Sequence, residues 1–152
     1  MDKEFERIYE LNNLSVLRLA YSYVYDQNDA EDIVQKTFYK LYKNSKILKL
    51  EDEEIKKWLY RVCINESKDL LKSSYKKRKT KLVLETIKEE SKDNNVIYLL
   101  QTIPDKYRIT IYLHYYEGYK INEIAKILKK SEPSIKKYLA EGKELLRKEL
   151  DK

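Results

Sequence analysis

The residues best suited to binding chemistry lie near the end of the chain, in a basic segment that follows Ser131. At helical spacing, one face of this segment carries polar and basic side chains: Ser134, Lys136, Lys137, Tyr138 and Lys143. Lysines pair with the phosphates that rim a DNA groove, and polar side chains hydrogen-bond the base edges inside it. The pattern therefore favours recognition of duplex DNA, and the plainer alternative is a helix with a solvated lysine face.

Two short helices must hold this face in place. The first is predicted over residues 121–128 by apolar residues that repeat at i, i+3, i+4 and i+7: Ile121, Ile124, Ala125 and Leu128. The second should begin at Ser131, whose hydroxyl can cap it, with Pro133 in its first turn. Its apolar positions are Ile135, Leu139, Leu146 and Leu150. Two helices joined by so short a turn predict a helix-turn-helix.

A second set of candidates lies on a predicted long helix over residues 55–74. Its inward side should consist of Ile55, Trp58, Leu59, Val62, Cys63 and Leu70. A polar stripe at i, i+4, i+7 and i+11 runs along the other side: Arg61, Asn65, Lys68 and Lys72. The stripe continues into a basic run that includes Lys76, Lys77 and Arg78. Such a stripe can follow a phosphate backbone while Asn65 hydrogen-bonds a base, and the alternative is a solvated face of long side chains.

A third candidate surface lies on a predicted helix that opens with Asp29 as its cap, followed by Asp32 in the first turn. Its buried stripe should be Ala30, Val34, Phe38 and Leu41. The outward side carries Asp32, Gln35, Lys36, Tyr39 and Lys43. The paired acids have no imidazole or thiol nearby, so we predict no metal site here.

Composition favours an all-α protein built from two small helical domains. The 152 residues include only 2 Gly and 2 Pro, with 42% hydrophobic and 38% charged residues. Upstream of the third surface, apolar residues form two helical stripes divided by Asn12 and Asn13. We expect a first domain over residues 1–81 and a second over 96–152, joined by an acidic tether over 82–95.

The charge distribution and the lack of long apolar runs indicate where the protein acts. The formal net charge is +6, and residues 71–81 alone hold six basic residues and no acid. The single Cys63 fits a reducing compartment, and no segment has the length or the apolar character of a membrane span or signal peptide. These features predict a cytoplasmic protein without stable membrane insertion.

The C-terminal segment resembles the promoter-binding domain of bacterial sigma factors of the extracytoplasmic-function (ECF) type. The matching residues are Ile103, Pro104, Arg108, Glu117, Gly118, Glu123, Ile124, Ala125, Leu128, Ser131, Ile135, Lys136, Leu139 and Leu146. Three positions depart from the family. Lys129 stands where a turn glycine is usual, and Tyr138 and Glu141 stand where arginines are common. The resemblance implies binding to the minus-thirty-five promoter element, with an altered sequence preference.

Two N-terminal segments carry the same resemblance. Residues 29–35, followed by Thr37, Phe38 and Leu41, resemble the helix that docks on the coiled coil of the largest polymerase subunit. The residues implied in polymerase binding are Asp29, Asp32, Gln35, Lys36 and Tyr39. Residues 58–62 with Asn65 and Asp69 resemble the part that engages the minus-ten element, where the family captures non-template bases as the duplex opens. By the same resemblance, the tether threads the RNA exit path of the polymerase.

Catalysis is poorly supported, because the chain has 1 His, no nucleotide-cradling glycine loop and no grouped carboxylates. We expect no cofactor, and we interpret His114 as structural. Two nucleic-acid-facing segments and a docking helix favour a sigma factor, which implies core RNA polymerase, promoter DNA and an anti-sigma protein as partners. The alternatives are a stand-alone helix-turn-helix repressor or activator and a sigma-like interaction protein without promoter binding.

Overall fold

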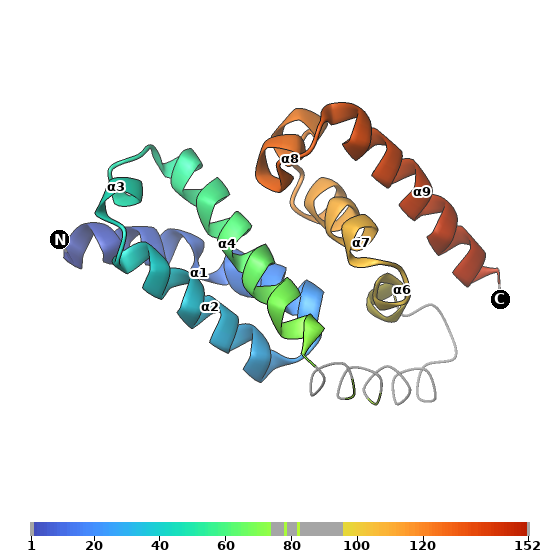
Figure 1. Cartoon of the computed structure of the whole chain (residues 1–152), viewed down its shortest axis with the longest axis horizontal. Helices are drawn as coiled ribbons and strands as arrows, with labels where there is room; N and C mark the ends of the chain where they lie inside the picture. The colour runs from blue at the N-terminus through green and yellow to red at the C-terminus, as the bar shows by residue number, and fades with distance from the viewer. Residues whose placement is uncertain (1, 74–77, 79–81, 83–95, 152) are drawn as a thin grey trace. The chain divides into compact units, whose positions relative to one another are not determined.

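The computed structural model describes residues 2–73, 78, 82 and 96–151, and the regular structure in these residues is entirely helical (Figure 1). The chain divides into two compact units, Met1–Lys76 and Lys77–Lys152. The predicted all-α class and the two helical domains are confirmed. None of the helices in the described part of the chain combines the length and apolar character that crossing a bilayer requires. Lys76, Lys77 and, apart from Leu82, the predicted tether lie outside the described residues.

The first unit is a bundle of three long helices, α1 (Asp2–Val24), α2 (Gln27–Tyr42) and α4 (Asp52–Lys72), with the short α3 (Ser45–Leu48) between the last two. Each long helix packs against the other two (Figure 1). Residues with side chains that are almost fully buried form the core: Ile8, Val16, Leu19, Tyr23, Leu41, Ile55, Leu59, Tyr60 and Cys63. Burial of these apolar side chains holds the three helices together.

Two predictions about the helix boundaries of this unit are wrong. The first helix is not divided at Asn12 and Asn13, because their amide groups donate to the helix carbonyls of Ile8 (3.0 Å) and Tyr9 (2.8 Å). The cap of α2 is Asp26 rather than Asp29, since the Asp26 carboxylate accepts from the backbone N–H of Asp29 at 2.9 Å.

The buried side of α4 also differs from the prediction. Tyr60, Ile64 and Ser67 are buried, whereas Trp58 and Val62 are only half-buried. Leu70, near the end of the helix, is half-buried as well. Because α4 packs against both α1 and α2, its buried side is wider than a single stripe. Trp58 lies outside this buried side.

The second unit consists of α6 (Val96–Thr102), α7 (Asp105–Ile111), a π-helical turn η1 (Tyr112–Tyr116), α8 (Ile121–Leu128) and α9 (Glu132–Leu150). Helix α9 packs against α7, α8 and α6. Leu113, Ile124, Ile127 and Ile135 are almost fully buried at the centre. Gly142 permits the close approach of α7, because an added Cβ would lie 2.8 Å from Ile111 Cδ1.

The helix-turn-helix has the predicted boundaries. Helix α8 spans residues 121–128, and the Ser131 hydroxyl caps α9 by accepting from the backbone N–H of Ser134 at 3.2 Å. Lys129, in the turn, is left-handed with φ 55° and ψ 47°. The apolar stripe of α9 is confirmed at Ile135 and Leu139, but Leu146 is half-buried and Leu150 is 53% exposed. Leu150 lies in the last turn of α9.

Candidate nucleic-acid and protein interfaces

The outward face of α2 is exposed along its length. Asp32, Gln35, Lys36 and Tyr39 are all exposed, and Asp29, in the first turn, is half-buried. Tyr39 is 60% exposed, and the Lys43 ammonium lies 5.1 Å from the centroid of its ring. The opposite face is buried in the bundle, so this face can bind a partner without unfolding the helix.

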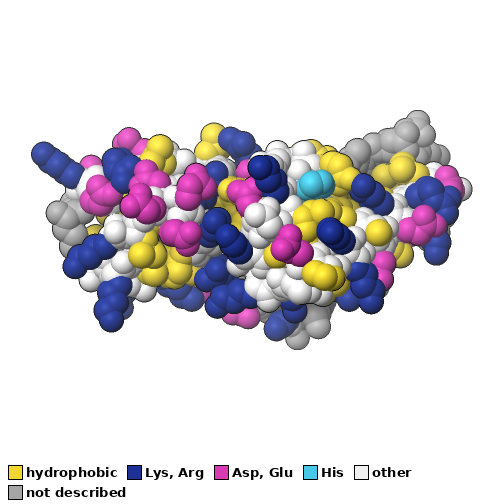
Figure 2. All heavy atoms as spheres, turned by 90° about the horizontal axis from the view of Figure 1, so that it is seen from above, with side chains coloured by type: hydrophobic (Ala, Val, Ile, Leu, Met, Phe, Trp, Pro, Cys, Tyr) yellow, Lys and Arg dark blue, Asp and Glu magenta, His cyan; other side chains and the backbone are white. Residues whose placement is uncertain are grey.

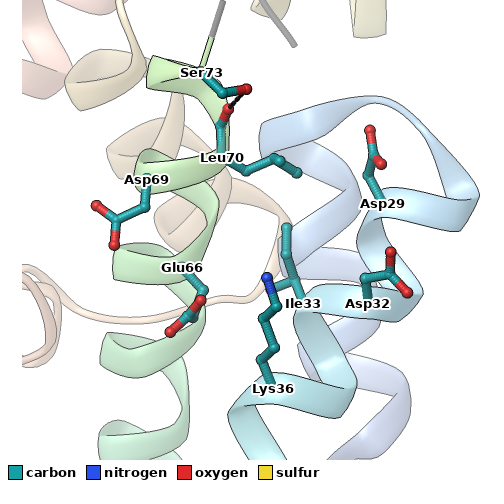
Figure 3. Close-up of a pocket in the computed structure, with 8 residues that line it drawn as sticks. All are labelled: Asp29, Asp32, Ile33, Lys36, Glu66, Asp69, Leu70 and Ser73. Carbon is teal, nitrogen blue, oxygen red and sulfur yellow. Dashed lines mark hydrogen bonds between the residues drawn. The ribbon is translucent and has the colours of Figure 1, made fainter. Parts of the chain in front are cut away.

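A hollow of about 280 Å³ lies between the outward face of α2 and the end of α4 (Figure 3). Its lining residues come from both helices: Asp29, Asp32, Ile33, Lys36, Glu66, Asp69, Leu70 and Ser73. Four carboxylates and one ammonium give the lining a negative formal charge, and Ile33 and Leu70 add apolar groups to it. Sequence reasoning did not place Glu66 at this surface, because only the packing of α4 against α2 brings it there.

An ion pair beside this hollow joins α2 to α4. The Lys40 ammonium lies 2.5 Å from the Glu66 carboxylate, whose side chain is only 16% exposed. The pair therefore links the helix that carries the candidate docking face to the helix that carries the basic stripe. Partial burial of Glu66 reduces the screening of this pair by solvent.

The stripe on α4 is only partly exposed. Asn65 and Lys72 are exposed, whereas Arg61 and Lys68 are half-buried. Arg78, in the basic run, is exposed. The i, i+4, i+7 and i+11 spacing places the four α4 residues on one face, where Asn65 is the exposed hydrogen-bonding group between basic side chains.

The basic face of α9 consists of Lys136, Lys137 and Lys143, which are all exposed. Lys137 lies 3.9 Å from the Glu141 carboxylate, an exposed pair that holds the lysine only weakly. The Lys143 ammonium lies 4.9 Å from the centroid of the Tyr115 ring. On the face drawn in Figure 2, Lys and Arg side chains are interspersed with acidic side chains.

Ser134 and Tyr138 are half-buried rather than fully outward. The Tyr138 ring meets the Tyr107 ring of α7 edge-on, with centroids 5.9 Å apart, and the Lys106 ammonium lies 5.4 Å from the Tyr138 centroid. The Tyr107 hydroxyl donates to the Glu141 carboxylate at 2.7 Å. This hydrogen bond raises the pKa of Tyr107. We call these four residues, Lys106, Tyr107, Tyr138 and Glu141, the α7–α9 cluster.

The two remaining side chains with reactive groups, His114 and Cys63, are held within the fold. His114 Nδ1 lies 2.9 Å from the Tyr119 carbonyl oxygen, in the turn before α8. The Cys63 thiol is fully buried, and burial raises its pKa to about 12. In the described part of the chain, no three His, Cys, Asp or Glu side chains gather as a metal ion would require.

Family models and curated relatives match most of this chain. The model described as Sigma-70 region 2 matches residues 8–77, and Sigma-70, region 4 matches residues 93–146. RNA polymerase sigma factor SigV of Bacillus subtilis (strain 168) is 33% identical over 140 residues, which cover 89% of this chain and 84% of SigV. ECF RNA polymerase sigma factor SigW of the same strain is 25% identical over 169 residues, covering 96% of this chain and 88% of SigW.

Two solved structures share the fold. CnrH, in complex with the cytosolic domain of CnrY, has a TM-score of 0.73 and 19% identity, covering 99% of this chain and 90% of CnrH. The sigma factor RpoE, in complex with the anti-sigma factor NepR from Bartonella quintana, has a TM-score of 0.71 and 18% identity, covering 98% of each chain.

The helix-turn-helix unit, the helical bundle and these matches define a transcription initiation factor. The chain belongs to the sigma-70 family of bacterial RNA polymerase sigma factors and is of the ECF type. It binds core RNA polymerase and directs promoter recognition and transcription initiation.

Proposed function

We propose a division of these tasks among the three surfaces, and we begin with polymerase binding. Asp29, Asp32, Gln35, Lys36 and Tyr39 of α2 form the docking face for a helical element of core polymerase. The proposal is supported by the exposure of Asp32, Gln35 and Tyr39 beside a separate buried stripe. Exposed acids can pair with basic partner side chains, and the Tyr39 ring supplies apolar contact area.

The minus-ten element is the proposed ligand of α4 and the basic run after it. The residues assigned to this task are Arg61, Asn65, Lys68, Lys72, Lys76, Lys77 and Arg78. Basic side chains would follow the phosphates of the non-template strand, while Asn65 holds an unstacked base by hydrogen bonds. Unstacking a base costs a few kcal/mol, so a side chain that holds the base favours the open duplex without bond chemistry.

The minus-thirty-five element is the proposed ligand of α9, through Ser134, Lys136, Lys137, Tyr138 and Lys143. Exposed Lys136 and Lys137, in the N-terminal half of the helix, occupy the positions from which a recognition helix usually contacts DNA. Tyr138 and Glu141 belong to the α7–α9 cluster, so we propose that the lysines dominate contact with DNA.

The proposed domain limits are residues 1–81, 82–95 and 96–152. The division into compact units near residue 76 and the start of α6 at Val96 support this organisation. We also propose an anti-sigma protein as a regulatory partner, because one structural relative was solved with one. These partners act in the cytoplasm, where we place the protein, and we propose no catalytic activity of its own.

The observation that carries this proposal is the separation of an exposed docking face on α2 from the polar stripe on α4 within one bundle. The test is transcription from a library of randomised promoters by core polymerase with and without the chain. We expect transcripts only with the chain, from templates that share two separated sequence elements. A chain that binds a palindromic duplex tightly without polymerase, and yields no transcript, would be a stand-alone repressor instead.

A further inference from the structure

The turn of the helix-turn-helix contains a lysine in a backbone conformation that favours glycine. Lys129 has φ 55° and ψ 47°, where the Cβ of an L-residue crowds the backbone. The turn itself is held by main-chain bonds, since the N–H groups of Lys129 and Lys130 both donate to the Ala125 carbonyl. Glycine could make the same bonds with less strain. The lysine side chain therefore contributes nothing to the closure of the turn.

Backbone strain of this kind often marks a functional position. Lys129 and the adjacent Lys130 are both exposed, and neither forms an ion pair with a residue that the structure describes. Lys126, one turn earlier on α8, is also exposed. From residue 126 to residue 137 the chain holds five lysines and one glutamate, a formal net charge of +4. This charge, concentrated at the turn and the start of α9, suits a polyanion.

The position of the turn identifies which part of the polyanion it meets. It directly precedes the N-terminal end of α9, which Ser131 caps. A recognition helix enters the major groove by its N-terminal residues, so the chain just before it lies at the rim of the groove. Phosphates form that rim, and the positive end of the helix dipole adds to their attraction.

We propose that Lys129 binds a backbone phosphate of the promoter duplex, at the rim of the groove that α9 enters. The contact is independent of sequence and adds affinity to the base contacts of α9. The positive φ of Lys129 thus lowers the stability of the turn, while its ammonium group adds a phosphate contact. This inference rests on the proposed binding of α9 to the minus-thirty-five element.

The test uses the full chain bound to core polymerase, on a duplex that carries its promoter. Lys129→Ala removes the charge but keeps a Cβ in the strained conformation, whereas Lys129→Gly removes both. Lys129→Arg keeps a cation. The matched control is Lys148→Ala, an exposed lysine in the last turn of α9. Affinity is measured over a series of salt concentrations, and the thermal midpoint of each variant checks the fold.

We expect Lys129→Ala and Lys129→Gly to reduce the slope of log affinity against log salt by about 0.9 each, the value of one lost phosphate contact. Lys129→Arg and Lys148→Ala should keep the wild-type slope. Only Lys129→Gly should raise the thermal midpoint, by about a few degrees, because only it relieves the strain.

Two outcomes would overturn the inference. The first leaves the proposed binding of α9 to DNA intact, and the second overturns that binding as well. If the wild type binds the promoter and the slopes of Lys129→Ala and Lys129→Gly are unchanged, Lys129 contacts no phosphate although α9 binds DNA. If the wild-type holoenzyme binds and transcribes its promoter, but removal of Lys136 and Lys137 leaves both the slope and the preferred promoter sequence unchanged, the proposed binding of α9 fails together with this inference.

Discussion

The hydroxyl of Tyr107 donates a 2.7 Å hydrogen bond to the carboxylate of Glu141 and so links α7 to the middle of α9. Tyr138, one turn before Glu141, packs edge-on against the same tyrosine ring. In the sigma factors that this chain resembles, the positions of Tyr138 and Glu141 commonly carry arginine. In this chain the side chains of Tyr138 and Glu141 brace α9 against α7, and α9 carries fewer positive charges than it would with arginine at these two positions.

This hydrogen bond predicts a stability effect that depends on pH. The bond raises the pKa of Tyr107 above the tyrosine value of about 10. A group whose pKa is raised by folding adds stability that is complete below its unfolded pKa and is lost as the pH rises through its folded pKa. We therefore expect Tyr107→Phe to lower the thermal midpoint slightly at pH 8, and the difference from wild type to disappear at strongly alkaline pH.

The measurement is a series of thermal unfolding curves for the two proteins from neutral to strongly alkaline pH. Because both aromatic rings pack alike, Tyr107→Phe keeps the edge-on contact and removes only the hydroxyl. A constant difference between the two midpoints across this range would show that the hydroxyl bond is not the source of the effect.

At Gly142, substitution by alanine sets a steric clash against a gain in helix propensity. Alanine is favoured over glycine in a helix by about 1 kcal/mol, but its Cβ would lie 2.8 Å from Ile111 Cδ1 and 3.1 Å from Tyr107 Cβ. Overpacking costs about 1–3 kcal/mol, so we expect Gly142→Ala to destabilise the protein by roughly 1 kcal/mol. Denaturant unfolding measures this. The control is Ala140→Gly at an exposed position of the same helix, which reports propensity alone.

Local signals predicted the second unit better than the first. Ser131 and Pro133 identify the start of α9 because a cap and a first-turn proline act within one helical turn. Asn12 misled the prediction, since its amide donates to the Ile8 carbonyl within the helix and does not interrupt it. The hollow lined by Glu66 and Asp69 was beyond sequence reasoning, because it depends on how α4 packs against α2.

The docking face on α2 predicts a selective loss of polymerase binding. Asp32→Lys combined with Gln35→Ala reverses one exposed charge and removes one exposed amide. Charge reversal at an interface repels the basic partner, so we expect core affinity to fall by roughly tenfold or more. Affinity is measured by titration of labelled protein with core polymerase. Glu10→Lys reverses an exposed charge on α1 and should have no effect, and an unchanged affinity in the double variant would refute the docking assignment.

Lys136 and Lys137 predict a salt-dependent loss of promoter binding. Both are exposed on α9, and removal of either lysine should reduce the slope of log affinity against log salt by about one unit. If either lysine reads a base instead, its variant will change the preferred promoter sequence at constant slope. Holoenzyme binding to a promoter library at two salt concentrations separates these results, and Lys148→Ala again serves as the control.

Asn65 predicts a defect in opening DNA rather than in finding it. The side chain is exposed on the α4 stripe, and Asn65→Ala removes its hydrogen bonds without adding charge. Assembly with core polymerase and closed binding should persist, because the α2 face and α9 are unchanged. A good base contact is worth about 1–3 kcal/mol, so open-complex occupancy should fall several-fold or more.

A fluorescent base analogue placed in the minus-ten element measures this opening directly, because its emission changes when the base unstacks. A promoter with a pre-melted minus-ten region provides the decisive comparison. If Asn65 holds an unstacked base only after the duplex opens, pre-melting removes the cost of unpairing and should restore most of the occupancy to Asn65→Ala. Should the pre-melted promoter fail to rescue the variant, or should the variant lose core binding instead, α4 is a docking or packing element and strand opening depends on other residues.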